Sequence, residues 1–316
     1  MKSKGLIITL IVILSILAIS LVGGMILLMN KSYNFDLSFN IEKSNLKLID
    51  SYETTPNSIQ KVDFDLTNVD IEVKETTEET FKVEYYSNKK KDINMSEQGN
   101  SLIVEDKDKN SVCVGICIEH RKVVLYVPQS YTGIYNLTTK SGDIKFENDI
   151  VNNELTIDTT SGDVALENAG NVYIKTVSGD VKAAEIGKSK IKTTSGDVKV
   201  KTAIESTEIS TVSGDIILGE GTKVSTSTTS GDVDITKISK SINSQTVSGD
   251  IIISNLTVVE NSSIKTTSGD VRISNNNSTC YVDASSTSGD ISIEKSDRKS
   301  DLTLTIKTLS GDIIVR

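Results

Sequence analysis

A three-residue motif, Ser-Gly-Asp, recurs ten times in the second half of the chain. Successive copies are separated by 20, 17, 17, 18, 17, 18, 20, 20 and 22 residues. The serines of the motif are Ser141, Ser161, Ser178, Ser195, Ser213, Ser230, Ser248, Ser268, Ser288 and Ser310. A period near 20 residues that is held over many copies indicates an architecture of stacked repeats.

The residues around each motif alternate between apolar and polar. Ile or Val stands three residues after every serine, and another apolar residue follows two positions later, as at Ile216 and Leu218. Two residues before the serine stands Thr in nine copies and Ser286 in the other. This alternation is typical of half-buried strands. Each repeat is therefore predicted to be a strand, a Ser-Gly-Asp corner, a second strand and a connection of variable length.

A repeat this short cannot bury its own apolar face, and a 17-residue period leaves no room for a helix. Stacked copies bury that face when each strand pairs with its equivalent in the next coil. We therefore predict an all-β fold, in which residues 136–316 form a parallel β-solenoid of about ten coils of 17–22 residues. A sandwich of β-hairpins is the alternative. It would explain the alternation but not why one corner recurs in register.

The glycine of each motif is expected to adopt a positive φ, which glycine does at little steric cost. The neighbouring Asp and Ser can hydrogen-bond the backbone of the same corner. The corner glycines are Gly142, Gly162, Gly179, Gly196, Gly214, Gly231, Gly249, Gly269, Gly289 and Gly311. The Thr column upstream has inward parity, so its hydroxyls are expected to bond to one another or to the backbone.

The first 30 residues differ in composition from the rest of the chain. Leu6–Met29 is an uncharged run of 24 residues, and a bilayer-spanning helix needs about 20. Ala18-Ile19-Ser20 is a poor signal-peptide cleavage site and lies within the run. Residues 1–30 are therefore predicted to be an uncleaved transmembrane anchor. Lys2 and Lys4 favour an inside N-terminus, which would place the bulk of the chain outside the cell membrane.

Between the anchor and the repeats we predict two further segments. Residues 31–60 are predicted to be a tether, since some alternation is mixed there with polar clusters and Pro56. Residues 61–135 are predicted to be an N-terminal β region that caps the solenoid, with strands at 62–66, 69–73, 81–85, 101–104 and 122–127. Asn68-Val69-Asp70 resembles a degenerate corner.

The charge of the chain argues against binding of nucleic acid. Outside the anchor, 32 basic and 43 acidic residues give a net charge of −11. Lys89-Lys90-Lys91 is the one short basic run, and no interleaved aromatic stripe accompanies it. Nucleic-acid-binding proteins present a basic patch or stripe instead.

At this point the chain resembles a known bacterial group, the putative-adhesin family. In that family a variable N-terminal β region ends in a strand with Val-Pro and leads into Thr-x-Ser-Gly-Asp repeats. Here those elements are Val123–Pro128 and the ten corners, so the resemblance covers about residues 61–316. With its anchor, the chain is similar to the LiaG-like, membrane-bound members linked to Firmicute cell-envelope stress operons. The resemblance implies a β-solenoid at the cell surface and brings no established activity, no cofactor and no catalytic residues.

The ten aspartates of the motif should form a row at a spacing of about 4.8 Å. One interpretation is that each carboxylate accepts backbone or serine hydrogen bonds at its corner. The other is a row of divalent-cation sites, for which the candidate ligands are Asp180, Asp197, Asp215, Asp232 and Asp250. One Asp per coil supplies few hard oxygen ligands for Ca²⁺ unless neighbouring coils share them. No metal is therefore assigned.

The remaining chemistry-bearing residues are few. Cys113 and Cys117 flank Val114-Gly115-Ile116 and could form a disulfide only around a tight turn at Gly115, because an extended strand would hold them too far apart. Cys280 is expected to be a free core residue. His120, the single histidine, is expected to lie exposed in a loop.

The sequence leaves two main functional classes open. The favoured one is a non-enzymatic surface module that binds a wall polymer or another envelope protein. The alternative is a structural spacer or a self-associating envelope protein. A binding module should present a coherent exposed patch, for which Ile217, Ile252 and Ile314 are the apolar candidates. A polysaccharide-active enzyme is the least favoured class, because aromatic residues make up only 4% of the chain and Trp is absent.

Overall fold

The computed structural model describes residues 46–55, 59–88, 92–107 and 120–316. The chain divides into two compact units, residues 1–44 and 45–316, and every described residue belongs to the second. The regular structure of the described residues is entirely β. Within these ranges no helix is long and apolar enough to cross a membrane. The anchor predicted at residues 1–30 lies outside the described residues.

The described strands, in chain order, are β1 (Lys47–Thr54), β2 (Lys61–Asp65), β3 (Asp70–Thr76), β4 (Phe81–Ser87), β5 (Ile93–Gln98), β6 (Ser101–Asp106), β7 (Arg121–Pro128), β8 (Ile134–Thr138), β9 (Ile144–Phe146), β10 (Ile150–Asp158), β11 (Val164–Lys175), β12 (Val181–Ile186), β13 (Ser189–Lys192), β14 (Val198–Ser210), β15 (Ile216–Ser227), β16 (Val233–Gln245), β17 (Ile251–Leu256), β18 (Ser262–Lys265), β19 (Val271–Asn276), β20 (Tyr281–Ser288), β21 (Ile291–Ile293), β22 (Thr303–Ser310) and β23 (Ile313–Val315).

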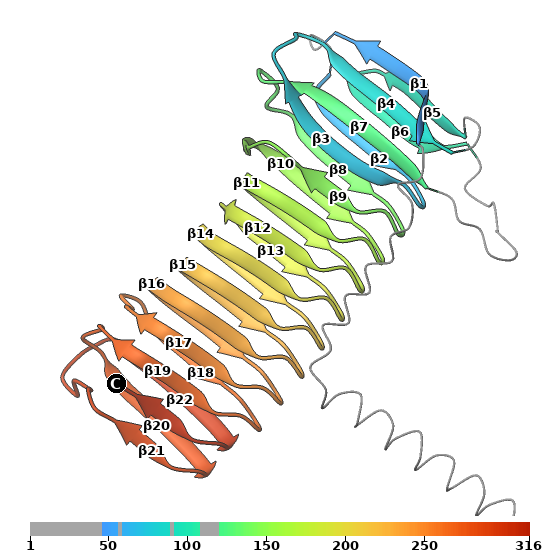
Figure 1. Ribbon diagram of the computed structural model, residues 1–316. Coiled ribbons are helices and arrows are strands. Elements are labelled where there is room, and N and C mark those ends of the chain that lie inside the picture. Colours follow the sequence, from blue (N-terminus) through green and yellow to red (C-terminus); the bar gives the residue numbers. More distant parts are fainter. Residues whose placement is uncertain (1–45, 56–58, 89–91, 108–119) are drawn as a thin grey trace, which may run out of the picture. The chain divides into compact units, whose positions relative to one another are not determined.

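The repeats form a parallel β-solenoid, which confirms the predicted fold (Figure 1). Strand segments that precede the corners line up in one sheet, the pre-corner sheet, and segments that follow the corners line up in a second, the post-corner sheet. The register follows the repeat alignment, since Val198 of β14 pairs with Ile216 of β15 and Ile209 pairs with Thr226. The ten corners are separated along the chain by nine turns.

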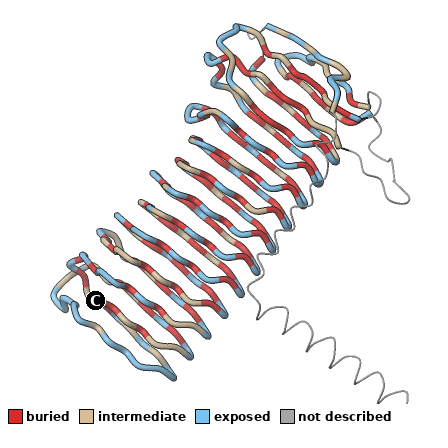
Figure 2. Tube along the Cα trace, in the orientation of Figure 1, coloured by how far each residue is buried: buried red, intermediate tan, exposed pale blue. Residues whose placement is uncertain are grey.

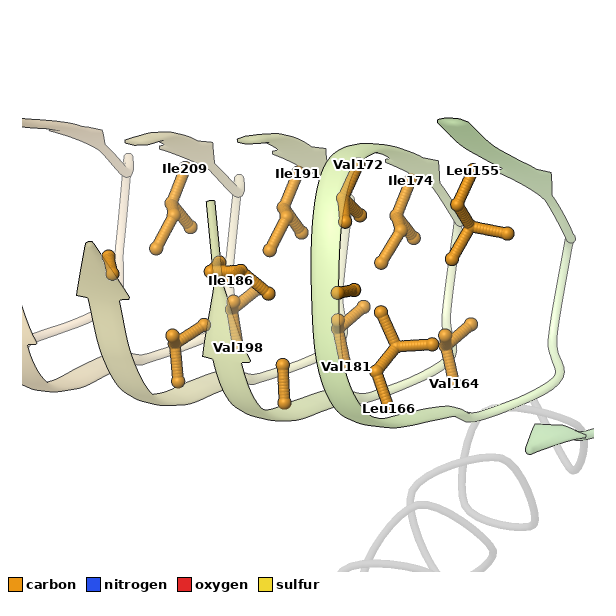
Figure 3. Close-up of a cluster of buried hydrophobic side chains, with 14 of the residues drawn as sticks. Leu155, Val164, Leu166, Val172, Ile174, Val181, Ile186, Ile191, Val198 and Ile209 are labelled. Carbon is orange, nitrogen blue, oxygen red and sulfur yellow. The ribbon is translucent and has the colours of Figure 1, made fainter. Parts of the chain in front are cut away.

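The apolar side chains of the two sheets point toward each other and form one continuous core. Figure 3 shows Val164, Leu166 and Val181 facing Val172 and Ile174 across the interior of successive coils. Buried and exposed residues alternate along the coils (Figure 2), as the period of two in the sequence predicts. The core therefore consists of columns of β-branched residues, each stacked on its equivalent in the next coil.

The corner glycines are required for a reason other than the predicted one. None of them has a positive φ, and among the described residues only Gly99 does. Instead, the backbones of successive corners approach closely. A Cβ on Gly214 would lie 2.0 Å from the carbonyl oxygen of Gly196, and the other corner glycines meet backbone oxygens at 1.8–2.1 Å. The glycine column lets the coils stack, because a side chain would collide with the preceding coil.

The buried Thr column satisfies the backbone at the corners, in agreement with its predicted inward parity. The Oγ1 atom of Thr211 accepts a hydrogen bond of 3.0 Å from the Gly214 amide of its own corner. The Thr246 hydroxyl donates to the Gly231 carbonyl of the preceding coil at 3.2 Å. These hydroxyls link consecutive corners where the chain has left the β ladders.

The N-terminal region is built on the same plan as the repeats. β2 and β3 form a coil that stacks on β8 and β9, and the corner between them is Asn68-Val69-Asp70. The Ser141 hydroxyl donates to Asn68 Oδ1 at 2.9 Å, so this degenerate corner occupies a regular place in the stack. β6 and β7 extend the two sheets by a further coil. Coil architecture therefore begins well upstream of the predicted boundary at residue 136.

Part of the predicted tether is a strand of this region. Residues 47–54 form β1, which pairs antiparallel with β4, while β4 pairs antiparallel with β7. β5, which the sequence analysis missed, forms an antiparallel hairpin with β6. The charges and hydroxyls of β1 obscured its alternation, because an edge strand buries neither face fully. Below these strands a chain of edge-to-face contacts fills the core, with Phe81, Tyr131, Tyr135 and Phe146 at centroid separations of 5.0–5.4 Å.

At the other end of the solenoid the coils do not stack in chain order. The last coil in sequence, β22 and β23, lies between the coil of β18 and β19 and the coil of β20 and β21. A Cβ on Gly289 would accordingly meet the carbonyl of Gly311 rather than that of Gly269. The longer spacings of 20 and 22 residues in this part of the chain supply the connections that the exchange requires.

Candidate ligand-binding surface

The corner aspartates form a continuous hydrogen-bonded row. From Asp70 to Asp312, one oxygen of each carboxylate accepts a bond from the backbone amide of the aspartate in the next coil, at 2.8–3.0 Å, and the Asp290 amide of the end coil is the last donor. The row begins at Asp70, whose pKa is raised by burial. Each carboxylate therefore braces the neighbouring coil through the backbone.

The five cation candidates, Asp180, Asp197, Asp215, Asp232 and Asp250, all belong to this row and each uses Oδ1 for its neighbour's amide. Among the described residues no group of three or more His, Cys, Asp or Glu is arranged to hold a metal ion. Cation binding by the row stays a hypothesis.

The other candidate residues are dispersed. Cys113 and Cys117 lie outside the described residues, so their disulfide stays a prediction. Cys280 is a free, buried thiol whose pKa is raised by burial, as expected of a core residue. His120 is half-buried and its Nε2 atom is covered, which differs from the exposed position predicted for it. His120 directly precedes β7 and is partly buried in the N-terminal region.

The apolar candidates do not form a coherent patch. Ile217 is 38% exposed, and Ile252 and Ile314 are half-buried on the outward side of the post-corner sheet. Pairing places Asp234 between Ile217 and Ile252, and Arg272 between Ile252 and Ile314. The column thus alternates between apolar and charged side chains, and no continuous apolar strip runs along this face.

The pre-corner sheet carries an open groove of about 700 Å³ that we call the pre-corner groove. It crosses six consecutive coils and is lined mainly by hydroxyl, amide and charged side chains. An aromatic ring, that of Tyr173, lies among them and is 38% exposed. The outward residues that define the groove are Glu154, Thr156, Asn171, Tyr173, Lys188, Lys190, Ser206, Glu208, Lys223, Ser225, Ser241, Asn243 and Asn261.

Three charged side chains of the groove form ion pairs. Lys190 and Glu208 are joined at 2.7 Å across neighbouring coils, and Lys223 lies 3.0 Å from Glu260. The Lys223 ammonium holds the pKa of Glu260 below its ordinary value. Glu154 and Lys188 also line the groove, but hydroxyl and amide groups outnumber the charged groups in its lining.

This groove was not predicted from the sequence. Its signal is a polar column five residues before each serine, which runs Thr156, Tyr173, Lys190, Glu208 and Ser225. The varied chemistry of this column hides it when the repeats are compared for identity. Its coherence becomes visible only when the coils are stacked.

A comparison with known protein families shows to which family the chain belongs. A family model described as Toastrack DUF4097 matches residues 59–227 and again residues 173–316. The chain belongs to the Toastrack family. The two matches overlap in the middle of the solenoid, as expected when one repeat pattern continues through both. A search of the curated proteins finds no match for this Toastrack chain.

Two solved structures are similar to this Toastrack chain. A putative cell adhesion protein from Clostridium sporogenes matches 85% of the chain over 98% of its own length, at 10% identity and a TM-score of 0.24. A putative adhesin from Parabacteroides distasonis matches 84% of the chain over 98% of its own length, at 13% identity and a TM-score of 0.36.

Proposed function

We propose that this Toastrack chain is a non-enzymatic cell-surface binding module of the adhesin type, and that its pre-corner groove binds an extended glycan of the cell envelope. The observation that carries the proposal is the groove itself, a long depression across six coils that is lined mainly by hydroxyl-, amide- and charge-bearing residues and contains one exposed aromatic ring. A role at the cell surface is in line with the anchor predicted at residues 1–30 and with the resemblance to membrane-bound proteins linked to envelope stress.

The chemistry of the groove suits a sugar polymer. Sugars present hydroxyl groups that pair with Ser, Thr and Asn side chains, and their apolar faces stack on aromatic rings. Asn171, Ser206 and Asn243 supply such partners, and Tyr173 supplies the ring. A specific ligand site combines apolar or aromatic surface with a few fixed polar groups. The β ladders hold these side chains on a rigid sheet, so little conformational entropy is lost on binding.

Binding without catalysis is the better-supported activity of this groove. Glycoside hydrolysis generally uses two carboxyl groups that flank the scissile bond, one of which is a proton donor. Here Glu208 is held by Lys190, and Glu260 is held by Lys223. These carboxylates are employed in ion pairs between neighbouring segments instead of being presented as an acid–base pair.

The proposal is tested with purified envelope polysaccharide and the full chain in detergent. Tyr173→Ala and Asn243→Ala should each weaken retention of the chain on immobilised polysaccharide. Ile217→Ala is the matched control, because Ile217 is as exposed as Tyr173 but lies on the post-corner face. Equal retention of all three variants and the parent would show that the groove is not the binding surface. Release of soluble sugar during the assay would contradict the non-enzymatic assignment.

The predicted location is tested separately. Protease added to wall-stripped cells should digest the β region if residues 31–316 lie outside the membrane. Protection of the β region under conditions that cleave an extracellular control would reverse the predicted orientation.

A further inference from the structure

The coil of β20 and β21 ends the solenoid with open strand edges. In the described part of the chain β20 has a ladder partner on one side, β22, and β21 has one, β23. Interior strands such as β15 have ladder partners on both sides. An edge strand presents unpaired N–H and C=O groups and is a template for another strand.

The hydrophobic core is open at the same place. Ile291 is 44% exposed, whereas its neighbour Ile313 in the same inward column is fully buried. Ala284 and Ile293, which also occupy inward positions, are only partly buried. Among the described residues none forms a further coil on these side chains, so a core column that is covered in the inner coils is open at this end.

A segment of the chain covers only one side of this end. The Ser296 hydroxyl accepts a hydrogen bond of 3.0 Å from the Val282 amide, and the Asp297 amide donates to the Cys280 carbonyl at 2.9 Å. These contacts protect the start of β20, where Val282 is buried. The remaining edge, residues 284–293, includes the end of β20, the corner and β21.

We propose that residues 284–293 form a self-association surface through which two copies of this chain join end to end. Strands of the second copy would add to both sheets and cover Ile291, in the way that each inner coil covers the coil before it. The proposal does not depend on the nature of the ligand in the pre-corner groove.

A second copy fits this end better than an unrelated partner does. The segment 294–301 beside the open edge carries three basic and three acidic residues, so it has no net charge that would repel a second copy and it offers both signs for ion pairs with one. Most homo-oligomers are closed by a twofold axis, at which one surface meets its own copy. The 8-residue β20 is the longer of the two open strands and would form the main contact.

Symmetry limits the assembly to two copies. A twofold axis perpendicular to the solenoid turns β20 of one copy against β20 of the other, so the two strands run antiparallel. The opposite end of the solenoid carries antiparallel strands β1, β4 and β5, and it does not present an equivalent coil. The open β20 and β21 edges of both copies are therefore covered in the dimer, and a third copy has no such edge to join.

Cysteine cross-linking in membranes that contain the full chain tests the proposal. The parent carries Cys113→Ser and Cys117→Ser, and cysteines replace Asp283, Ser285 or Thr287 one at a time along β20. Only residues near a twofold axis meet their own copies, so at least one of the three should give several-fold more cross-linked dimer than the parent. Ser227→Cys is the matched control, because Ser227 and Ser285 occupy equivalent repeat positions and Ser227 lies in an inner coil.

A charge at the contact should reverse the effect. Ile291→Lys, added to the most reactive cysteine variant, should reduce cross-linking to the level of the Ser227→Cys control while the chain stays folded, since Ile291 is already partly in solvent. Ile217→Lys should leave cross-linking unchanged. Cross-linking of β20 at the control level would overturn the proposal, and so would products larger than a dimer or insensitivity to Ile291→Lys.

Discussion

The Asp215 amide donates a hydrogen bond of 2.9 Å to the Oδ1 atom of Asp197, one coil away. The same bond recurs from Asp70 at one end of the row to Asp290 at the other. The carboxylates act on the coil that follows them, and their negative charges lie close together in a row. Hydrogen bonding and charge repulsion therefore oppose each other along the corner, and substitutions can separate them.

Asp215→Asn is expected to change the free energy of unfolding by about 1 kcal/mol or less, because the amide oxygen still accepts the Asp232 bond and one repelling charge is removed. Asp215→Ala should be more destabilising, by about 1 kcal/mol, since the Asp232 amide exchanges its carboxylate acceptor for water. Thermal unfolding of the three proteins with and without millimolar Ca²⁺ gives the comparison. A Ca²⁺-dependent rise in melting temperature that shrinks in the Asn variant would establish the row as a cation site.

Gly214→Ala should destabilise the solenoid by about 3 kcal/mol or more, because the new methyl group would lie 2.0 Å from the Gly196 carbonyl oxygen. Gly187→Ala is the milder comparison, since its Cβ would lie 2.9 Å from the Gly170 carbonyl oxygen, a weaker clash than that at Gly214. Hydrogen exchange of β14 and β15 should accelerate much more in the first variant than in the second. Similar exchange in both would show that close stacking does not select glycine.

Thr211→Val should cost roughly 1–3 kcal/mol, because the isosteric side chain leaves the buried Gly214 amide without its acceptor. Thr211→Ser keeps the hydroxyl and should cost less, although it removes a methyl group from the core. From highest to lowest, the melting temperatures are therefore predicted to follow the order parent, Ser variant, Val variant. If the Val variant is as stable as the parent, the hydroxyl column contributes packing alone.

The pKa of Glu147 is lowered to about 2, mainly by its hydrogen bond of 2.7 Å to Lys145. Because the folded pKa is depressed, this carboxylate stabilises the fold above its unfolded pKa of about 4.3 and loses that contribution as the pH falls toward 2. Lys145→Gln should raise the pKa of Glu147 in an NMR titration of its side-chain carboxyl carbon. Lys199→Gln, at the equivalent position of a distant repeat, should leave it unchanged.

The parallel solenoid could be predicted because the same alternation of apolar and polar residues recurs around ten Ser-Gly-Asp motifs. Residues such as Ile216 and Leu218 recur at fixed distances from the corner, and stacking equivalents is the arrangement that buries them all. The role of glycine was predicted wrongly, because a column of glycines in sequence does not distinguish a positive φ from close approach between coils. Both explanations remove the side chain, and only the backbone conformation separates them.

The ends of the solenoid and the groove could not be predicted for different reasons. The exchange of the last two coils depends on which strand docks on Ile264 and Val271, and the coils of β20 and β22 carry the same motif. Strand β1 has little periodicity because it lies at an edge. The pre-corner groove is formed by outward side chains from six coils, so its sequence signal, the varied polar column five residues before each serine, is spread over six repeats and is not recognisable in any one of them.

The exchange of the last two coils also determines how this end of the molecule bears mechanical load. The Arg316 amide donates to the Ile273 carbonyl, and the Asn276 amide donates to the Arg316 carbonyl, so Arg316 is held beside an inner coil. A force applied at Arg316 would draw β23 out from between β19 and β21, and would shear two ladders at once. In a stack that followed chain order, the same force would peel one terminal coil from a single neighbour. Because β23 lies between two ladders, more hydrogen bonds must break together before the chain unravels from this end under tension.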